Sequence, residues 1–200
     1  MIRYILASGS PRRKELLGQI GLQFEISVAT GEEIITKEKP WEIVEELSRQ
    51  KALEVAERYI GQQRGDTDVI IGADTIVAFE NGSKTEIMGK PKDAADAKRM
   101  LKLIQNNTHQ VYTGVAILKY DLKGNETIIN QAVKTDVYVN PMTDEEIWNY
   151  IEKDNVMDKA GAYGIQSGFA IHIEKIEGDY FNVVGLPISF IYEAMKGEER

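Results

Sequence analysis

Apolar and polar positions follow two different periods along this chain, and its first part predicts strands and helices in alternation. An apolar run at residues 4–7 and an alternating run at 24–28 predict short strands. Residues 11–20 and 40–61 carry apolar side chains at helical spacing, and each segment begins with a proline, which suits the first turn of a helix. In the second of these helices we expect Trp41 to face the core.

The most apolar stretch lies at residues 68–79, where few polar residues interrupt the run. This pattern is typical of a central strand that is covered on both faces. Asp74 lies in the middle of it. A buried carboxylate costs free energy unless a cation, a metal ion or several hydrogen-bond donors receive it. We therefore expect Asp74 to have a partner, and we favour a functional role over a structural pairing with an arginine.

The remainder of the chain predicts antiparallel strands and three further helices. In order, we expect a hairpin turn at 81–82, a strand at 85–88, a helix capped by Asp93, long strands at 110–119 and 128–139 joined by a turn at 121–125, a helix with a capping box at Thr143, a glycine-containing loop at 158–166, a strand at 169–176, a helix after Pro187 and a frayed end at 197–200. Residues 1–200 thus predict one α/β domain, a mixed sheet flanked by helices with an antiparallel meander lobe, and a cleft between two lobes.

Composition and charge exclude several classes of function. A hydrophobic content of 42% with 28% charged residues is ordinary for a globular protein. The net charge of -8 argues against a nucleic-acid surface, which needs a broad basic face. The absence of cysteine and the presence of only two histidines exclude thiolate chemistry and a histidine-rich metal site. No stretch is apolar enough to span a membrane or to serve as a signal peptide, so we expect a cytoplasmic protein.

The stretch YILASGSPRR at residues 4–13 predicts a strand, a tight loop and a helix with Ser10 as N-cap and Pro11 as its first residue. The free amides of a first helical turn favour an anion, and Arg12 and Arg13 add two cations. We interpret the stretch as a grip for a polyphosphate. The alternative is an ordinary strand-to-helix junction with solvated arginines. Lys90, between a glycine and a proline, has the same two interpretations.

Nine polar residues are hard to explain as scaffold. They are Ser8, Ser10, Arg12, Arg13, Glu33, Lys51, Asp74, Lys90 and Gln166. Carboxylates that can hold Mg²⁺ or Mn²⁺, together with cations that offset phosphate charge, predict metal-assisted hydrolysis of a phosphate ester. The chain has neither G-x-x-x-x-G-K-[ST] nor G-x-G-x-x-G after a strand, so neither a P-loop nor a dinucleotide fold is indicated.

The sequence resembles the Maf family of nucleoside triphosphate pyrophosphatases. The motifs that carry the resemblance are LASGSPRR, RQKA, IGADTIV, GKP, TGVA, DKAGAYGIQ and NVVGLP, in order from residue 6 to residue 187. The resemblance implies a fold similar to that of the inosine triphosphate pyrophosphatases. It also implies hydrolysis of a nucleoside triphosphate to the monophosphate and pyrophosphate with a divalent metal ion, Mg²⁺ or Mn²⁺, and it allows a homodimer.

The resemblance also implies roles for individual residues. Asp74 matches the family's proton acceptor, and Arg12, Thr75 and Gln166 match the positions linked to substrate choice, in the combination of the branch that prefers dTTP and UTP. Ser8, Arg13, Glu33, Lys51 and Lys90 match further pocket positions, with Glu33 as the second carboxylate beside Asp74 for the metal. Two alternatives stay open. One is a nucleotide-binding regulator of septum formation, and the other is the same chemistry on a modified nucleotide.

Overall fold

The computed structural model describes residues 2–59, 67–82, 84–121 and 123–196. The chain forms two compact units. Unit 1 comprises Met1–Asp74, Thr113–Val133 and Gly185–Arg200, and unit 2 comprises Thr75–Tyr112 and Lys134–Val184. Since the chain passes from one unit to the other within three of its strands, neither unit is a continuous segment of sequence.

A seven-stranded mixed sheet supplies the backbone framework. Its strands are ordered β2-β1-β3-β5-β6-β7, and β4 pairs with β3. The strands are β1 (Ile2–Leu6), β2 (Phe24–Ile26), β3 (Thr67–Asn81), β4 (Lys84–Met88), β5 (Thr108–Asp121), β6 (Glu126–Val139) and β7 (Ile173–Glu177). The expectation of a mixed α/β sheet flanked by helices is confirmed, as is the pair of long strands that follows the third helix.

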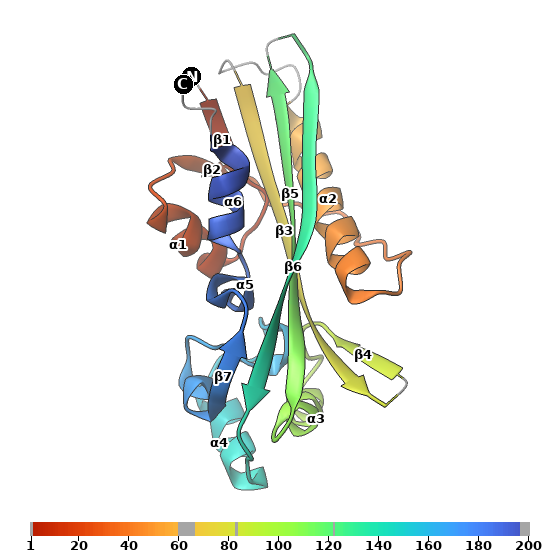
Figure 1. Ribbon diagram of the computed structural model, residues 1–200, viewed down its shortest axis with the longest axis vertical. Helices are drawn as coiled ribbons and strands as arrows, with labels where there is room; N and C mark the ends of the chain where they lie inside the picture. The colour runs from red at the N-terminus through yellow and green to blue at the C-terminus, as the bar shows by residue number, and fades with distance from the viewer. Residues whose placement is uncertain (1, 60–66, 83, 122, 197–200) are drawn as a thin grey trace. The chain divides into compact units, whose positions relative to one another are not determined.

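Unit 1 begins with a parallel arrangement of β2, β1 and β3. Tyr4 pairs with Phe24 on one side and with Val69 on the other. Helix α1 (Pro11–Gln19) links β1 to β2, and α2 (Pro40–Tyr59) links β2 to β3. Within this unit, α1 and α6 (Ile188–Met195) lie on one side of the strands and α2 lies on the other (Figure 1). Both faces of β3 are therefore covered here, which explains its nearly unbroken burial from Val69 onward.

Helix α2 approaches the strands of unit 1 unusually closely. A Cβ atom at Gly72 would lie 2.3 Å from the Ser48 carbonyl oxygen, and one at Gly114 would lie 2.0 Å from the Val44 carbonyl oxygen. Such separations are far inside van der Waals contact, so only glycine fits at these two strand positions. The apolar face of α2, which includes the fully buried Ala52, rests directly on the strand backbones.

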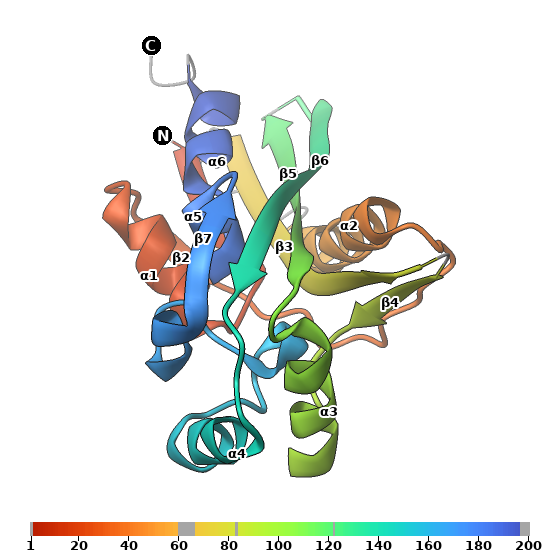
Figure 2. The ribbon, with the colours of Figure 1, turned by 60° about the horizontal axis from the view of Figure 1, so that its bottom comes forward.

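Unit 2 contains α3 (Ala94–Ile104), α4 (Asp144–Lys153), α5 (Tyr180–Val184) and two 3₁₀ turns, η1 (Ala160–Ala162) and η2 (Gly168–His172). Helices α3 and α4 lie against each other (Figure 2). Both helices start where the sequence predicts, because Asp93 accepts a bond from the Asp96 amide and Thr143 forms a capping box with Glu146. Phe169 is fully buried in the core of this unit.

The structure corrects two expectations from the sequence. Trp41 is 43% exposed, because the buried stripe of α2 runs through Pro40, Ile43 and Val44 and leaves Trp41 outside it. The strand expected at 169–176 begins only at Ile173. Phe169 and His172 are both buried three residues apart, which is the period of a 3₁₀ turn. The sequence did not predict helix α5. The expected end of the second helix at residue 61 and the frayed end expected at 197–200 lie outside the described residues.

Candidate active site

The candidate site of unit 1 lies where the parallel strands end. The last pairing of β1 joins Leu6 to Ile71 of β3, and Ser8 follows two residues after Leu6. Strand β2 ends at Ile26 and leads into the segment that carries Glu33, while β3 continues to Asp74. Because parallel strands present their carboxyl ends at one edge, these polar residues gather there, as ligand-binding residues commonly do in α/β folds.

Arg13 joins three segments of unit 1. Its Nε donates to the Gly185 carbonyl oxygen at 2.8 Å, and its Nη1 donates to the Ala73 carbonyl oxygen at 2.9 Å and to the Ser8 hydroxyl at 3.2 Å. Burial lowers the pKa of Arg13, and the nearby carboxylate of Asp74 opposes that shift. The guanidinium thus holds the residue next to Asp74. The sequence did not predict these hydrogen bonds of Arg13, because two of its acceptors are backbone carbonyl groups, which every residue has.

The loop before α1 forms as expected, with one difference. Ser10 is the N-cap residue of α1, and Pro11 is its first residue, but the Ser10 side chain makes no capping bond. Instead, the buried Ser8 hydroxyl accepts a bond from the Ser10 amide at 3.3 Å. Arg12 is partly buried at the start of the same helix. Ser8 therefore orders both the turn and the Arg13 side chain.

Lys51 connects two carboxylates. Its Nζ lies 2.5 Å from Asp74 Oδ1 and 2.8 Å from Glu33 Oε1. The Asp74 side chain is 12% exposed and that of Glu33 is 53% exposed, so the pair of carboxylates reaches from the interior to the surface. The expectation that Asp74 needs a partner is confirmed, although the partner is a lysine and not an arginine.

The position of Lys51 follows from the close approach of α2. Gly72 and Asp74 are two residues apart on β3, so their side chains point to the same face of the strand. The backbone of α2 at Ser48 and Ala52 lies against Gly72. Lys51, which lies between these two residues on the helix, contacts Asp74. The glycine contact therefore sets the distance at which the ammonium and the carboxylate meet.

The two carboxylates suit a hard divalent cation, because Mg²⁺ and Mn²⁺ prefer oxygen ligands. Among the residues that the structure describes, no group of three or more His, Cys, Asp or Glu side chains could hold a metal ion. This is compatible with Mg²⁺, which is commonly held by one or two carboxylates together with the phosphates of a substrate. Glu33 and Asp74 fit that description.

Three of the predicted site residues belong to unit 2. Thr75 is partly buried at the start of this unit's portion of β3, while Lys90 and Gln166 are exposed. Lys90 follows Gly89, whose carbonyl oxygen accepts a bond from the Gly161 amide at 3.0 Å. Gly161 has a φ of 67° and would meet Val77 if it carried a Cβ, so the small residues of the 158–166 loop allow this packing.

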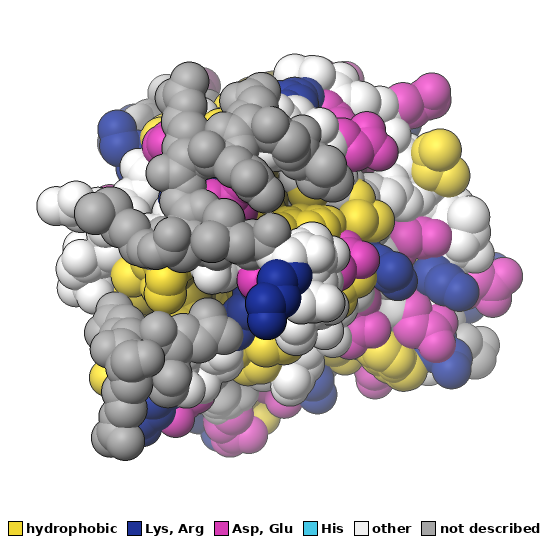
Figure 3. Space-filling view, turned by 90° about the horizontal axis from the view of Figure 1, so that it is seen from above, with side chains coloured by type: hydrophobic (Ala, Val, Ile, Leu, Met, Phe, Trp, Pro, Cys, Tyr) yellow, Lys and Arg dark blue, Asp and Glu magenta, His cyan; other side chains and the backbone are white. Residues whose placement is uncertain are grey.

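On the face drawn in Figure 3, carboxylates and cationic side chains are interspersed and form no basic field, which is the arrangement expected of a chain with a net charge of -8. Over the described residues, no helix combines the length and the apolar character that a membrane span requires.

Comparisons with known proteins identify the family of this chain. The dTTP/UTP pyrophosphatase of Agathobacter rectalis is 50% identical over 203 residues, covering 98% of this chain and 97% of that protein. The dTTP/UTP pyrophosphatase of Lachnoclostridium phytofermentans is 44% identical over 196 residues, covering 98% and 95%. The solved structure of the Staphylococcus aureus Ham1 protein aligns with 98% of this chain and 99% of that one, with 13% identity and a TM-score of 0.42. Residues 3–198 match the family described as Maf-like protein, and the chain therefore belongs to the Maf family.

Proposed function

We propose that this protein is a nucleoside triphosphate pyrophosphatase that hydrolyses dTTP and UTP to the monophosphate and pyrophosphate. The observation that carries the proposal is the Asp74–Lys51–Glu33 cluster at the carboxyl ends of the parallel strands. Relatives that are 44% and 50% identical over nearly the whole chain bear the name dTTP/UTP pyrophosphatase, which supports this substrate class. A chain with cations and carboxylates but no cysteine suits phosphate chemistry better than acyl transfer.

In the proposed reaction, a water molecule attacks the α-phosphorus. The new bond joins the water oxygen to this phosphorus, the bond to the bridging oxygen of the β-phosphate breaks, and pyrophosphate leaves. Asp74 accepts the proton of the attacking water. Arg13 holds Asp74 in place through the Ala73 carbonyl, while Lys51 adds positive charge beside the developing phosphate charge.

A divalent cation completes the proposal. Glu33 and Asp74 would hold Mg²⁺ or Mn²⁺ together with the substrate phosphates. When bound, the ion offsets negative charge on the phosphates and favours attack at phosphorus. Lys51 contacts both carboxylates, so its ammonium keeps them near each other. Ser8, Ser10 and Lys90 are proposed to contact the triphosphate.

Recognition of the base is assigned to Arg12, Thr75 and Gln166. A glutamine side chain offers both a donor and an acceptor, which matches the O4 and N3–H edge that uracil and thymine share. Gln166 is exposed on a loop of small residues, where its amide is accessible to a ligand. A Gln166→Glu variant loses the donor, so we expect it to change the preference among bases more than the rate on the preferred one.

The test is an assay of pyrophosphate release from a panel of canonical, methylated and deaminated nucleoside triphosphates with Mg²⁺ or Mn²⁺. We expect release mainly from dTTP and UTP, and a loss of about 10³-fold or more in kcat for Asp74→Asn. Asp68→Asn is the matched control, because Asp68 is a carboxylate of the same strand that also pairs with a cation, Arg3.

The outcomes separate the parts of the proposal. Activity of Asp74→Asn at the level of the control would remove Asp74 as proton acceptor. Release of pyrophosphate mainly from a methylated or deaminated nucleotide would keep the reaction and discard the assignment of dTTP and UTP. Diphosphate and phosphate as products would move the attack away from the α-phosphorus.

A further inference from the structure

Helix α2 holds the segment that carries Glu33 through a row of polar side chains, which we call the α2 ladder. The ladder consists of Glu46, Gln50, Glu54 and Arg58, spaced four residues apart and therefore lying along one face of the helix. Together they contact residues between 27 and 36, in the segment that connects β2 to α2. We propose that the α2 ladder positions Glu33 for the reaction, an inference that rests on the proposed function.

The central rung binds the backbone at both of its polar atoms. Gln50 Nε2 donates to the Ile34 carbonyl oxygen at 2.5 Å, and Gln50 Oε1 accepts from the Ile34 amide at 3.1 Å. A side-chain amide that pairs with both groups of one residue fixes the direction of the chain there as well as its distance. Ile34 is the neighbour of Glu33, so this rung orients the carboxylate.

The outer rungs fix the ends of the segment. Glu54 accepts from the amides of Thr30 at 2.8 Å and Gly31 at 3.0 Å. Glu46 accepts from the amide of Thr36 at 2.8 Å and from its hydroxyl at 2.6 Å. These bonds lower the pKa of both glutamates, because hydrogen bonds from amides and hydroxyls favour the charged carboxylate.

Arg58 completes the ladder by donating to the Val28 carbonyl oxygen at 2.8 Å. From Arg58 to Glu46 the helix rises about 18 Å, and the eight residue steps from Val28 to Thr36 would span about 26 Å if fully extended. Because the extended segment would be longer than the stretch of helix beside it, the chain can curve away from the helix between Gly31 and Ile34. Glu33 lies in this curved part and forms an ion pair with Lys51, the residue after Gln50.

This segment has little regular structure or burial of its own. Residues 28–39 form no regular secondary structure, and residues 28 and 30–39 are exposed. Ala29 is partly buried and packs against an apolar cluster of unit 1. Ile34 is 61% exposed and Ile35 is 55% exposed, so apolar burial contributes little. The position of Glu33 therefore depends on the ladder and on its own contact with Lys51.

The experiment compares Gln50→Ala and Glu54→Ala with the wild type and with Glu57→Ala, an exposed position of the same helix that lies off the ladder. Amide exchange followed by NMR reports whether Gly31, Ile34 and Thr36 are protected. Titration with Mn²⁺ in the absence of nucleotide, followed by electron paramagnetic resonance, reports the affinity of the carboxylates. We expect both ladder variants to lose protection and about 10-fold in Mn²⁺ affinity, and the control to keep both.

Kinetics add a readout that simple destabilisation would not change. In the ladder variants, we expect a higher Mn²⁺ requirement with kcat restored at saturating Mn²⁺, and Gln50→Glu, which keeps the acceptor for the Ile34 amide, should recover part of the loss. Unchanged Mn²⁺ affinity in a variant that has lost protection at Ile34 would overturn the proposal. If the wild type releases no pyrophosphate, the proposed function fails, whereas exchange and the Mn²⁺ titration still decide on the ladder.

Discussion

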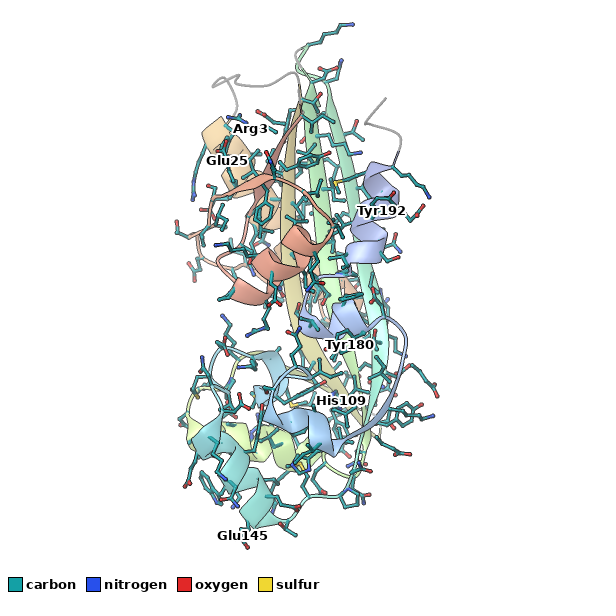
Figure 4. All side chains as sticks on the ribbon, turned by 90° about the vertical axis from the view of Figure 1, so that its left-hand side faces the viewer. Arg3, Glu25, His109, Glu145, Tyr180 and Tyr192 are labelled. Carbon is teal, nitrogen blue, oxygen red and sulfur yellow. The ribbon has the colours of Figure 1, made fainter. Side chains whose placement is uncertain are left out.

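The two units bury polar side chains of different kinds. Unit 1 buries charge, since Asp74, Lys51 and Arg13 share one neighbourhood and each contacts partners within it. Unit 2 buries a neutral pair, in which His109 Nε2 lies 2.8 Å from the Tyr163 hydroxyl and both residues belong to the interior. Figure 4 labels His109 among the side chains of this unit. Burying a charge costs desolvation free energy, and buried charges are common at functional sites. A neutral hydrogen bond is enough to stabilise the interior of a folded unit.

The largest effect on stability should come from breaking the charge pair of unit 1. Lys51→Met keeps the length of the side chain but leaves Asp74 without its cation, which should lower the free energy of unfolding by about 3 kcal/mol. Adding Asp74→Asn should recover part of this loss, since the buried carboxylate that lost its lysine is then neutral. Urea unfolding of the two single variants and the double variant measures the coupling, and strictly additive losses would contradict it.

The close approach of α2 should give the next largest effect. Gly114→Ala places a methyl group against the Val44 carbonyl, and because backbone cannot move as a rotamer does, we expect a loss of about 2 kcal/mol. Gly18→Ala is the control. A Cβ there meets nothing within 4 Å, so a gain of about 0.5–1 kcal/mol is expected. Thermal unfolding of both variants tests the contrast, and equal changes would refute it.

A smaller effect concerns pH and the neutral pair of unit 2. Burial lowers the pKa of His109 to about 3, so the unfolded chain binds a proton near pH 6.5 that the folded chain refuses. This contribution to stability is present above pH 6.5 and is lost as pH falls towards 3. From pH 7 to 5.5 the loss should be about 1 kcal/mol. His109→Gln should flatten the dependence in urea unfolding, and an unchanged slope would argue against His109 as its source.

The partner hydroxyl provides the smallest of the four effects. Tyr163→Phe removes the bond to His109 while keeping the aromatic packing against Phe169, whose ring centroid lies 4.7 Å away. We expect a loss of about 1 kcal/mol in unfolding free energy and no change in pyrophosphate release. A large loss of activity in this variant would show that unit 2 uses this pair for more than its own stability.

Local signals account for the parts of the fold that the sequence predicted well. The apolar run of β3 and the caps at Asp93 and Thr143 each act within one element, so a reader of the sequence can recognise them. Trp41 illustrates the opposite case. Its helical spacing is compatible with the core, but Lys39 lies over its ring at the surface, and only the docking of α2 decides which face is buried.

The site divides in the same way. Asp74 was recognisable because a carboxylate in an apolar strand demands a partner. The identity of that partner depends on a contact across 23 positions of sequence, which no local pattern encodes. Gln50 and Glu54 were missed altogether, because polar residues four apart on a helix normally indicate a solvated face.

The ladder contacts residues 28–36 mainly through their backbone atoms, and this has a consequence for how the protein can change. The side chains of Glu32, Ile34 and Ile35 are exposed, and the ladder does not bind them. A library randomised at these three positions should therefore retain the fold and the protection of the backbone amide at position 34. The backbone of this segment is thus held in place while several of its side chains are free to vary, beside the Glu33 carboxylate, whose position must be kept.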